Sequence, residues 1–157
     1  MRSRVTRVVP VLVAIGLASL LLAAPSMAGG TTTLTASLTG EAERPGPGDE
    51  NGTGTASIVI DTVNNRVCFS LDWDRIRAPF AAHIHRGSAE VAGPVRVTLF
   101  ASDVPLPATI SGVDGCVEDV SPTLLANMVE NPQLFYVNIH NRPFPNGAVR
   151  GQLSNPV

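Results

Sequence analysis

The three histidines are the residues of this chain with the clearest capacity for chemistry. His83 and His85 lie two positions apart in the run Ala-His-Ile-His-Arg-Gly, and residues at i and i+2 of a strand project from the same face. His140 lies in a second alternating segment, opposite the apolar residues of that segment. If the two segments pair, three imidazoles and Asn138 share one patch. Neutral imidazole binds copper and zinc, so this patch would suit one mononuclear metal ion.

The same histidines also have a purely structural interpretation, in which they hydrogen-bond to loop carbonyls and hold the turns together. A lone His-x-His pair favours this interpretation over a metal site. Arg150 is expected to pair with a carboxylate, either Glu43 or Asp72, and Gly151 to allow a close approach of two backbones. Patterns typical of nucleophilic catalysis or phosphate binding are absent from the sequence. We therefore expect no catalytic residues and, on balance, no enzyme.

Residues 1–28 are predicted to be a signal peptide that is cleaved after Ala28. Three arginines lie in the first seven residues, an apolar run from Val8 to Ala24 follows, and small residues flank the expected cleavage site. An uncleaved anchor helix is the alternative, but the run is near the lower length limit for spanning a bilayer and Pro10 interrupts its start. We expect a secreted domain over residues 29–157, with no stable membrane span once the leader is removed.

The charge balance restricts the classes of partner. The chain has 13 acidic and 11 basic residues, and removal of the three leader arginines leaves an acidic domain that contains no lysine. Such a surface does not suit nucleic acid or anionic lipid. Arginine as the only long basic side chain is typical of a GC-rich coding sequence and indicates a bacterial source. The expected partner is an extracellular ligand or a component of the cell envelope.

Cys68 and Cys116 are the only cysteines, and both follow the leader. In an oxidising compartment an even pair predicts one disulfide, although two free buried thiols are an alternative. Closure of a loop of about 50 residues would contribute about 4 kcal/mol in the chain-entropy model. The alternation around Cys68 places it off the core face. The bond is therefore expected to fasten a turn, residues 112–116, across the outer face or edge of the sheet.

Alternating apolar residues predict seven or eight short strands. The predicted strands cover residues 31–39, 55–60, 66–72, 83–85, 95–100, 109–111, 134–140 and 148–153. Asn64-Asn65 predicts a tight hairpin turn, and residues 41–54, rich in glycine and proline, predict a mobile connection. Ser121 as N-cap and Pro122 as first residue predict one short helix. The pattern is typical of an all-β, antiparallel, immunoglobulin-like or Greek-key β-sandwich with one short helix.

Several short motifs, in order along the expected mature chain, resemble the CHRD domain, which is named from chordin and occurs in secreted bacterial proteins. The motifs are Leu38-Thr39-Gly40, Glu43-Arg44-Pro45, Gly54-Thr55-Ala56, Ala82-His83-Ile84-His85, Gly93-Pro94-Val95, Tyr136-Val137-Asn138-Ile139-His140 and Arg150-Gly151-Gln152-Leu153. The resemblance implies an extracellular, β-rich, immunoglobulin-like domain with no established activity, and the two cysteines look like the pair in bacterial members. Arg44 departs from the aliphatic residue usual before this proline.

A second, fainter similarity is to copper/zinc superoxide dismutase, whose sandwich also has a His-x-His strand after a hairpin. That enzyme needs more histidines for its dinuclear site than the three found here, and its bridging ligand has no counterpart. Two hypotheses follow from the sequence. The first is a secreted, non-enzymatic binding or structural module, and the second is a mononuclear copper or zinc protein that uses His83, His85 and His140.

Overall fold

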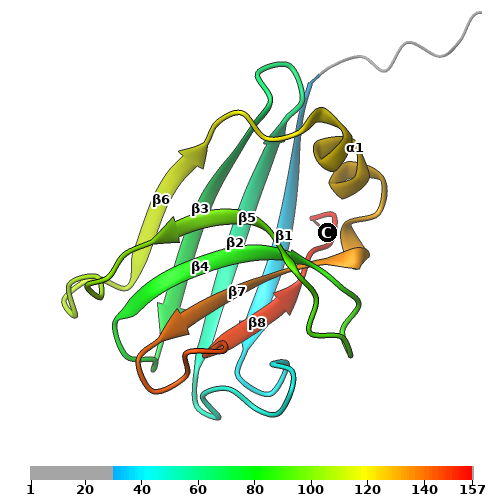
Figure 1. Cartoon of the computed structure of the whole chain (residues 1–157). Helices are drawn as coiled ribbons and strands as arrows, with labels where there is room; N and C mark the ends of the chain where they lie inside the picture. The colour runs from blue at the N-terminus through cyan, green and yellow to red at the C-terminus, as the bar shows by residue number, and fades with distance from the viewer. Residues whose placement is uncertain (1–29, 157) are drawn as a thin grey trace, which may run out of the picture.

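A computed structural model describes residues 30–156, and the predicted signal peptide lies outside this range. The described part is all-β, as predicted, with antiparallel strands, one α-helix and one 3-10 turn (Figure 1). The elements are β1 (Thr31–Thr39), β2 (Thr53–Asp61), β3 (Arg66–Asp74), β4 (Pro79–Arg86), β5 (Val95–Ala101), β6 (Gly112–Val117), α1 (Pro122–Glu130), η1 (Pro132–Leu134), β7 (Phe135–Asn141) and β8 (Val149–Gln152). Among these residues no helix is long and apolar enough to cross a membrane.

The eight strands form one hydrogen-bonded sheet in the order β5-β4-β7-β8-β1-β2-β3-β6. Figure 1 shows that this sheet folds over, so that β5, β4, β7 and β8 make one layer across a second layer of β1, β2, β3 and β6. The sheet passes from one layer to the other between β8 and β1. The register of these two strands contains the single pair Thr39 and Arg150. The end strands β5 and β6 also contact each other, which makes the sandwich nearly a barrel.

The hydrophobic core fills the space between the two layers. Strands alternate because every second residue points into this space, and fully buried members include Leu34, Ile58, Val67, Ile84 and Val137. Helix α1 covers one end of the core with Leu125 and Met128. Pro122 is its first residue, although the Ser121 side chain makes no capping hydrogen bond.

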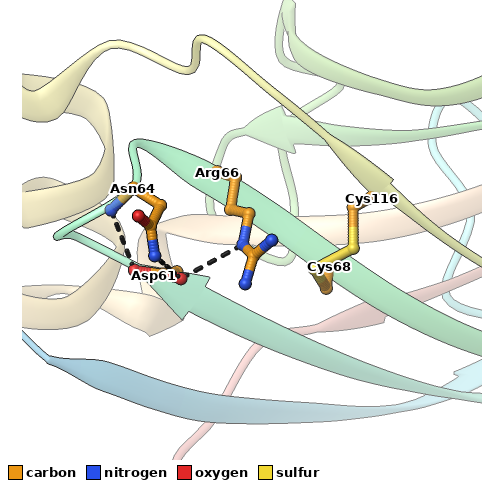
Figure 2. Close-up of a disulfide and its surroundings, with 5 residues drawn as sticks. All are labelled: Asp61, Asn64, Arg66, Cys68 and Cys116. Atoms are coloured by element: carbon orange, nitrogen blue, oxygen red, sulfur yellow. Dashed lines mark hydrogen bonds and ion pairs between the residues drawn. A yellow bond between two sulfur atoms is a disulfide. The ribbon is translucent and has the colours of Figure 1, made fainter.

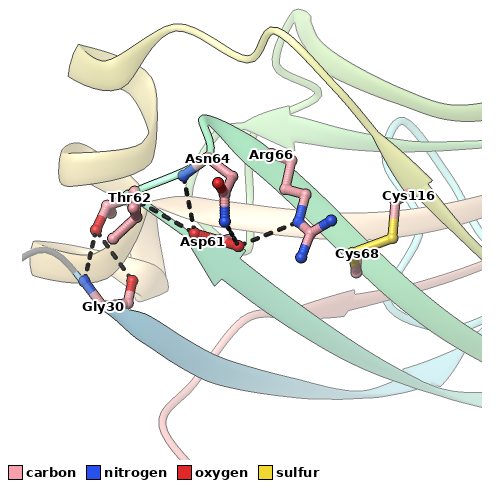
Figure 3. Close-up of polar contacts among 8 residues, drawn as sticks. Gly30, Asp61, Thr62, Asn64, Arg66, Cys68 and Cys116 are labelled. Atoms are coloured by element: carbon pink, nitrogen blue, oxygen red, sulfur yellow. Dashed lines mark hydrogen bonds and ion pairs between the residues drawn. A yellow bond between two sulfur atoms is a disulfide. The ribbon is translucent and has the colours of Figure 1, made fainter.

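The hairpin between β2 and β3 confirms the Asn64-Asn65 turn. Asn65 has a φ of 54°, a conformation that asparagine tolerates better than most residues. The Asp61 carboxylate accepts hydrogen bonds from the backbone N–H groups of Val63 and Asn64 and pairs with Arg66 at 3.1 Å. Figures 2 and 3 show its contacts with Asn64 and Arg66. Its hydrogen bonds with Asn64 lower the pKa of Asp61. This polar cluster lies in the β1–β2–β3–β6 layer.

Two sequence-based expectations are wrong around Cys116. Residues 109–111 are not a strand, and residues 112–116 are not a turn, because Gly112–Val117 forms the edge strand β6 beside β3. Its two glycines and one aspartate hide the apolar alternation that marks a strand. Cys68 and Cys116 are directly opposite in the register and form the predicted disulfide, with Cα atoms 3.9 Å apart (Figure 2). The bond therefore links two paired strands.

The connection between β1 and β2, predicted to be mobile, is tied to the rest of the molecule. The Gly48 N–H donates to Gly40 O at 2.7 Å, and the Asp49 N–H donates to Ala148 O at 2.8 Å. These bonds bring Glu43 against the layer of β5, β4, β7 and β8, where Glu43 is 3 % exposed. Composition alone did not show this, because glycine and proline allow a packed loop as readily as a loose one.

Candidate metal site

Strands β4 and β7 are neighbours, and their pairing brings the three histidines together. In the register His83 is opposite Asn138, His85 is opposite Tyr136, and Ala81 is opposite His140. All of these polar residues point away from the core, on the outer face of the sheet, as their alternation predicted. The pairing of β4 with β5 is irregular on both sides of His83, and such bulges re-aim side chains next to functional sites.

The three imidazoles are close enough to share one ion. One ring nitrogen from each of His83, His85 and His140 can be chosen so that all lie within 4.8 Å of one another. His83 Nδ1 is 3.0 Å from His140 Nε2. Metal–nitrogen bonds of about 2.0–2.1 Å place tetrahedral ligand atoms about 3.3 Å apart. Small side-chain rotations would therefore bring these nitrogens into a ligand arrangement.

Two backbone carbonyls fix which nitrogen of His85 and His140 carries the proton. His85 Nδ1 is 2.8 Å from Gly93 O, and His140 Nδ1 is 3.0 Å from Pro145 O. A carbonyl oxygen only accepts, so each Nδ1 carries the hydrogen and the lone pair of each ring is on Nε2. His140 Nε2 lies 3.0 Å from the side-chain amide of Asn138, recorded as its Oδ1. A lone pair on His140 Nε2 therefore requires the NH2 group of this amide at that position, since the amide oxygen and nitrogen are interchangeable by a flip. His85 Nε2 is buried and makes no hydrogen bond of acceptable geometry among residues 30–156. The Asn138 side chain is near enough to oppose the lowering of the His85 pKa, but it does not meet the distance and angle of a hydrogen bond to this nitrogen. An Nδ1–H bonded to a carbonyl with a free Nε2 is the usual arrangement of a metal-binding histidine.

The surroundings keep the histidines neutral, which is the form that binds metal. Burial, followed by the proximity of His140 and His85, lowers the pKa of His83 to about 4. Burial also lowers the pKa of His85 and of His140, although their carbonyl partners oppose this shift. His83 is the half-buried member and the other two are buried. The site is therefore open to solvent on the His83 side.

A stack of three side chains lies behind His85. Its ring is parallel to that of Tyr136, with an interplanar angle of 10° and centroids 4.7 Å apart. Arg150 Cζ lies 3.4 Å from the centre of the same Tyr136 ring. Two groups this close to one ring centre must occupy opposite faces, so Tyr136 separates His85 from the positive charge. The Tyr136 hydroxyl accepts from the Gly93 N–H at 3.1 Å and lies 3.4 Å from Gly93 O.

Arg150 does not make the predicted ion pair with a carboxylate among residues 30–156. It is 1 % exposed, and its Nη2 donates instead to Ser88 O at 2.8 Å. Glu43 attracts it through space, and Asp72 lies on β3 in the other layer. Burial raises the pKa of Glu43 to about 7, against the opposing attraction of Arg150. Stacking on Tyr136 and the bond to Ser88 O satisfy the guanidinium only in part, because its Nη1 is buried with no hydrogen-bond partner among residues 30–156.

The remaining motif residues fasten the loop of residues 87–93 over this outer face. Gln152 Nε2 donates to Gly87 O at 2.6 Å, and Pro94 O accepts from the Arg86 N–H at 3.1 Å. Gly151 is a position of close backbone approach, as predicted, because a Cβ there would overlap Ser37 O. Residues that are far apart in the sequence thus meet around one loop.

Sequence reasoning identified the histidines, Asn138 and Arg150 but missed the roles of Tyr136 and Glu43. Tyr136 alternates with the apolar residues of β7 and lies on the same face as Asn138 and His140, yet nothing in its pattern indicates a stack on His85. Glu43 lies in a loop whose path depends on long-range bonds. The disulfide lies in the other layer and takes no part in the site.

The comparison with known families gives one match. A family model described as the CHRD domain matches residues 34–153, which run from within β1 to the residue after β8. The match therefore includes all three histidines and the residues that surround them. Searches of the curated proteins and of the solved structures gave no match.

Proposed function

The chain belongs to the CHRD domain family, and we propose that it is an extracellular, non-enzymatic module that binds one copper or zinc ion through His83, His85 and His140. The observation that carries this proposal is the ring-nitrogen cluster within 4.8 Å, in which the buried His85 Nε2 has no partner among residues 30–156. A buried acceptor without a hydrogen bond costs free energy of folding. A bound ion would satisfy it.

The chemistry of the cluster restricts the ion. Three neutral imidazoles with no carboxylate or thiolate suit late first-row metals, and affinity for such nitrogen sites peaks at copper. Hard ions such as Ca²⁺ and Mg²⁺ need oxygen ligands instead. The chain has no other histidine, so it supplies ligands of this type for one ion. A secreted location agrees with the disulfide, which persists in oxidising compartments.

Metal uptake by the purified, metal-free protein tests the proposal directly. Isothermal titration with Cu²⁺ and with Zn²⁺ at pH 7 should show binding of one equivalent. The variant His83→Gln changes the half-buried ligand, which is the one whose replacement disturbs packing least. We expect it to weaken the affinity by more than about 100-fold, because loss of a direct ligand should exceed the usual effect of losing its outer-shell partners.

The matched control is Asp61→Asn, which removes a charge from a polar cluster in the other layer. It should lower the stability of the hairpin and leave the metal affinity unchanged. Wild-type protein that takes up neither ion, or a His83→Gln variant that binds as tightly as wild type, would overturn the proposal.

A further inference from the structure

We propose that Tyr136 and Arg150 are positioning residues for the metal ligand His85, on which they act through the backbone of loop 87–93. The inference rests on the proposed function, because it concerns the same site. Neither side chain contributes a ligand atom. Their contribution is to hold the one carbonyl that decides which nitrogen of His85 is free.

Gly93 is the point at which this control is exerted. Its carbonyl oxygen is 2.8 Å from His85 Nδ1, and the bond exists only while Gly93 stays in place. The Tyr136 hydroxyl holds both polar groups of the same residue, since it accepts from the Gly93 N–H and donates to the Gly93 oxygen. The Tyr136 ring also stacks on the imidazole. One side chain therefore fixes both the plane of His85 and its hydrogen-bond partner.

Arg150 holds this arrangement from the other side. Its guanidinium covers the second face of Tyr136 and donates to Ser88 O in the same loop. Gln152, two residues further along β8, donates to Gly87 O. Side chains of β7 and β8 thus fasten loop 87–93 at three backbone points. This gives a physical reason for an arginine that is 1 % exposed without an ion pair to a carboxylate in the described chain.

Loss of this control would change the chemistry of His85. A neutral imidazole without the Gly93 bond can place its hydrogen on Nε2, and that tautomer offers no lone pair at the position that faces His83 and His140. Partners that fix the orientation of a ligating histidine are typically worth about 10–100-fold in metal affinity. We expect an effect of this size here, without loss of the fold.

The variant Tyr136→Phe tests the inference. It removes the hydroxyl and keeps the ring between His85 and Arg150. We expect Cu²⁺ and Zn²⁺ to bind at least about 10-fold more weakly. In the metal-free protein, ¹⁵N chemical shifts of the His85 ring should show one fixed tautomer in wild type and a mixture in the variant. A role in stability alone would not change the tautomer.

Thr62→Val is a closely matched control. The Thr62 hydroxyl also bonds to both polar groups of one glycine, since it accepts from the Gly30 N–H at 3.1 Å and donates to Gly30 O at 3.0 Å (Figure 3). The Thr62→Val variant therefore loses the same kind of contact pair in the other layer. We expect a smaller loss of stability than in Tyr136→Phe, because the Thr62 bonds are exposed and those of Tyr136 are part-buried, with unchanged metal affinity and an unchanged His85 tautomer.

Two readouts separate this inference from the proposed function. If wild-type protein binds no metal, the proposed function fails, and the tautomer measured in metal-free protein still decides whether Tyr136 positions His85. If Tyr136→Phe leaves the tautomer fixed, or if Thr62→Val weakens metal binding as much as Tyr136→Phe does, the positioning role is wrong. A tautomer mixture together with weaker metal binding in Tyr136→Phe alone supports it.

Discussion

Glu43 is a buried carboxylic acid, 3 % exposed, with a pKa raised to about 7. Its Oε1 has no hydrogen-bond partner among residues 30–156. Burial accounts for the shift, because the charged form loses its hydration while Arg150 compensates only in part. The folded protein therefore keeps a proton on Glu43 at a pH where the unfolded chain has released it.

This shift has a defined sign in the stability of the metal-free protein. Because the folded pKa of Glu43 lies above the ordinary value of 4.5, its contribution is fully present below pH 4.5 and is lost as the pH rises through 7. His83 acts in the opposite direction. Its folded pKa of about 4 lies below 6.5, so the unfolded chain binds the extra proton and stability rises with pH between about 4 and 6.5.

Glu43→Gln removes the first of these effects and leaves the second. The free energy of unfolding of the variant, relative to wild type, should rise by about 2–3 kcal/mol between pH 5 and pH 8, since one pKa unit corresponds to about 1.4 kcal/mol. Denaturant titrations across this range measure it. Glu41→Gln, at an exposed position of the same loop, is the matched control. Parallel pH curves for Glu43→Gln and wild type would contradict the assignment.

At the scale of elements, prediction from sequence succeeds where alternation is clear and fails where contacts decide. Strands β4 and β7 alternate strictly around the histidines, so their outer face could be predicted, and pairing of the two strands was the single unknown. Strand β6 has two glycines in six residues, which hide its period. The connection between β1 and β2 and the loop of residues 87–93 show no periodic pattern of apolar residues. Their bonds to the rest of the molecule, at Gly93 and Ser88 in loop 87–93 and from the first connection to Ala148, depend on the complete fold.

Strand β6 gives the prediction that belongs to this scale. It is an end strand of the sheet, and the bond between Cys68 and Cys116 closes a separation of 48 residues. Replacing both cysteines by serine should lower the free energy of unfolding by about 4 kcal/mol in the chain-entropy model. Neither position is buried, so the two hydroxyls add little cost.

The metal affinity of this double variant should equal that of wild type, because the disulfide joins β3 and β6 whereas the histidines lie on β4 and β7. Denaturant midpoints and metal titrations on the same preparation measure both properties. A loss of stability below about 1 kcal/mol would contradict the entropic account. A loss of metal binding would mean that the two layers are coupled more strongly than their contacts indicate.

At the scale of the whole molecule, the two layers are continuous only at β8 and β1. This junction is short, since β8 has four residues and its register with β1 contains one pair, which a bridge between Thr35 and Ser154 supplements. It also contains Arg150 and Gln152, which hold the loop beside His85. The position of the layer of β5, β4, β7 and β8 and the geometry of the histidine cluster therefore depend on the same short strand.

Gly151→Ala tests this dependence. A Cβ at residue 151 would overlap Ser37 O and press on Leu38, so β8 would have to move away from β1. We expect a loss of more than about 2 kcal/mol of stability, in the range of a severe packing change, together with weaker metal binding because Arg150 moves with the strand.

Gly46→Ala is the contrasting variant. Gly46 has a φ of 88° and no atom within 4 Å of an added Cβ, so it should cost about 1–3 kcal/mol from backbone strain alone and leave metal binding intact. Equal effects of the two variants on metal affinity would show that the junction does not control the site.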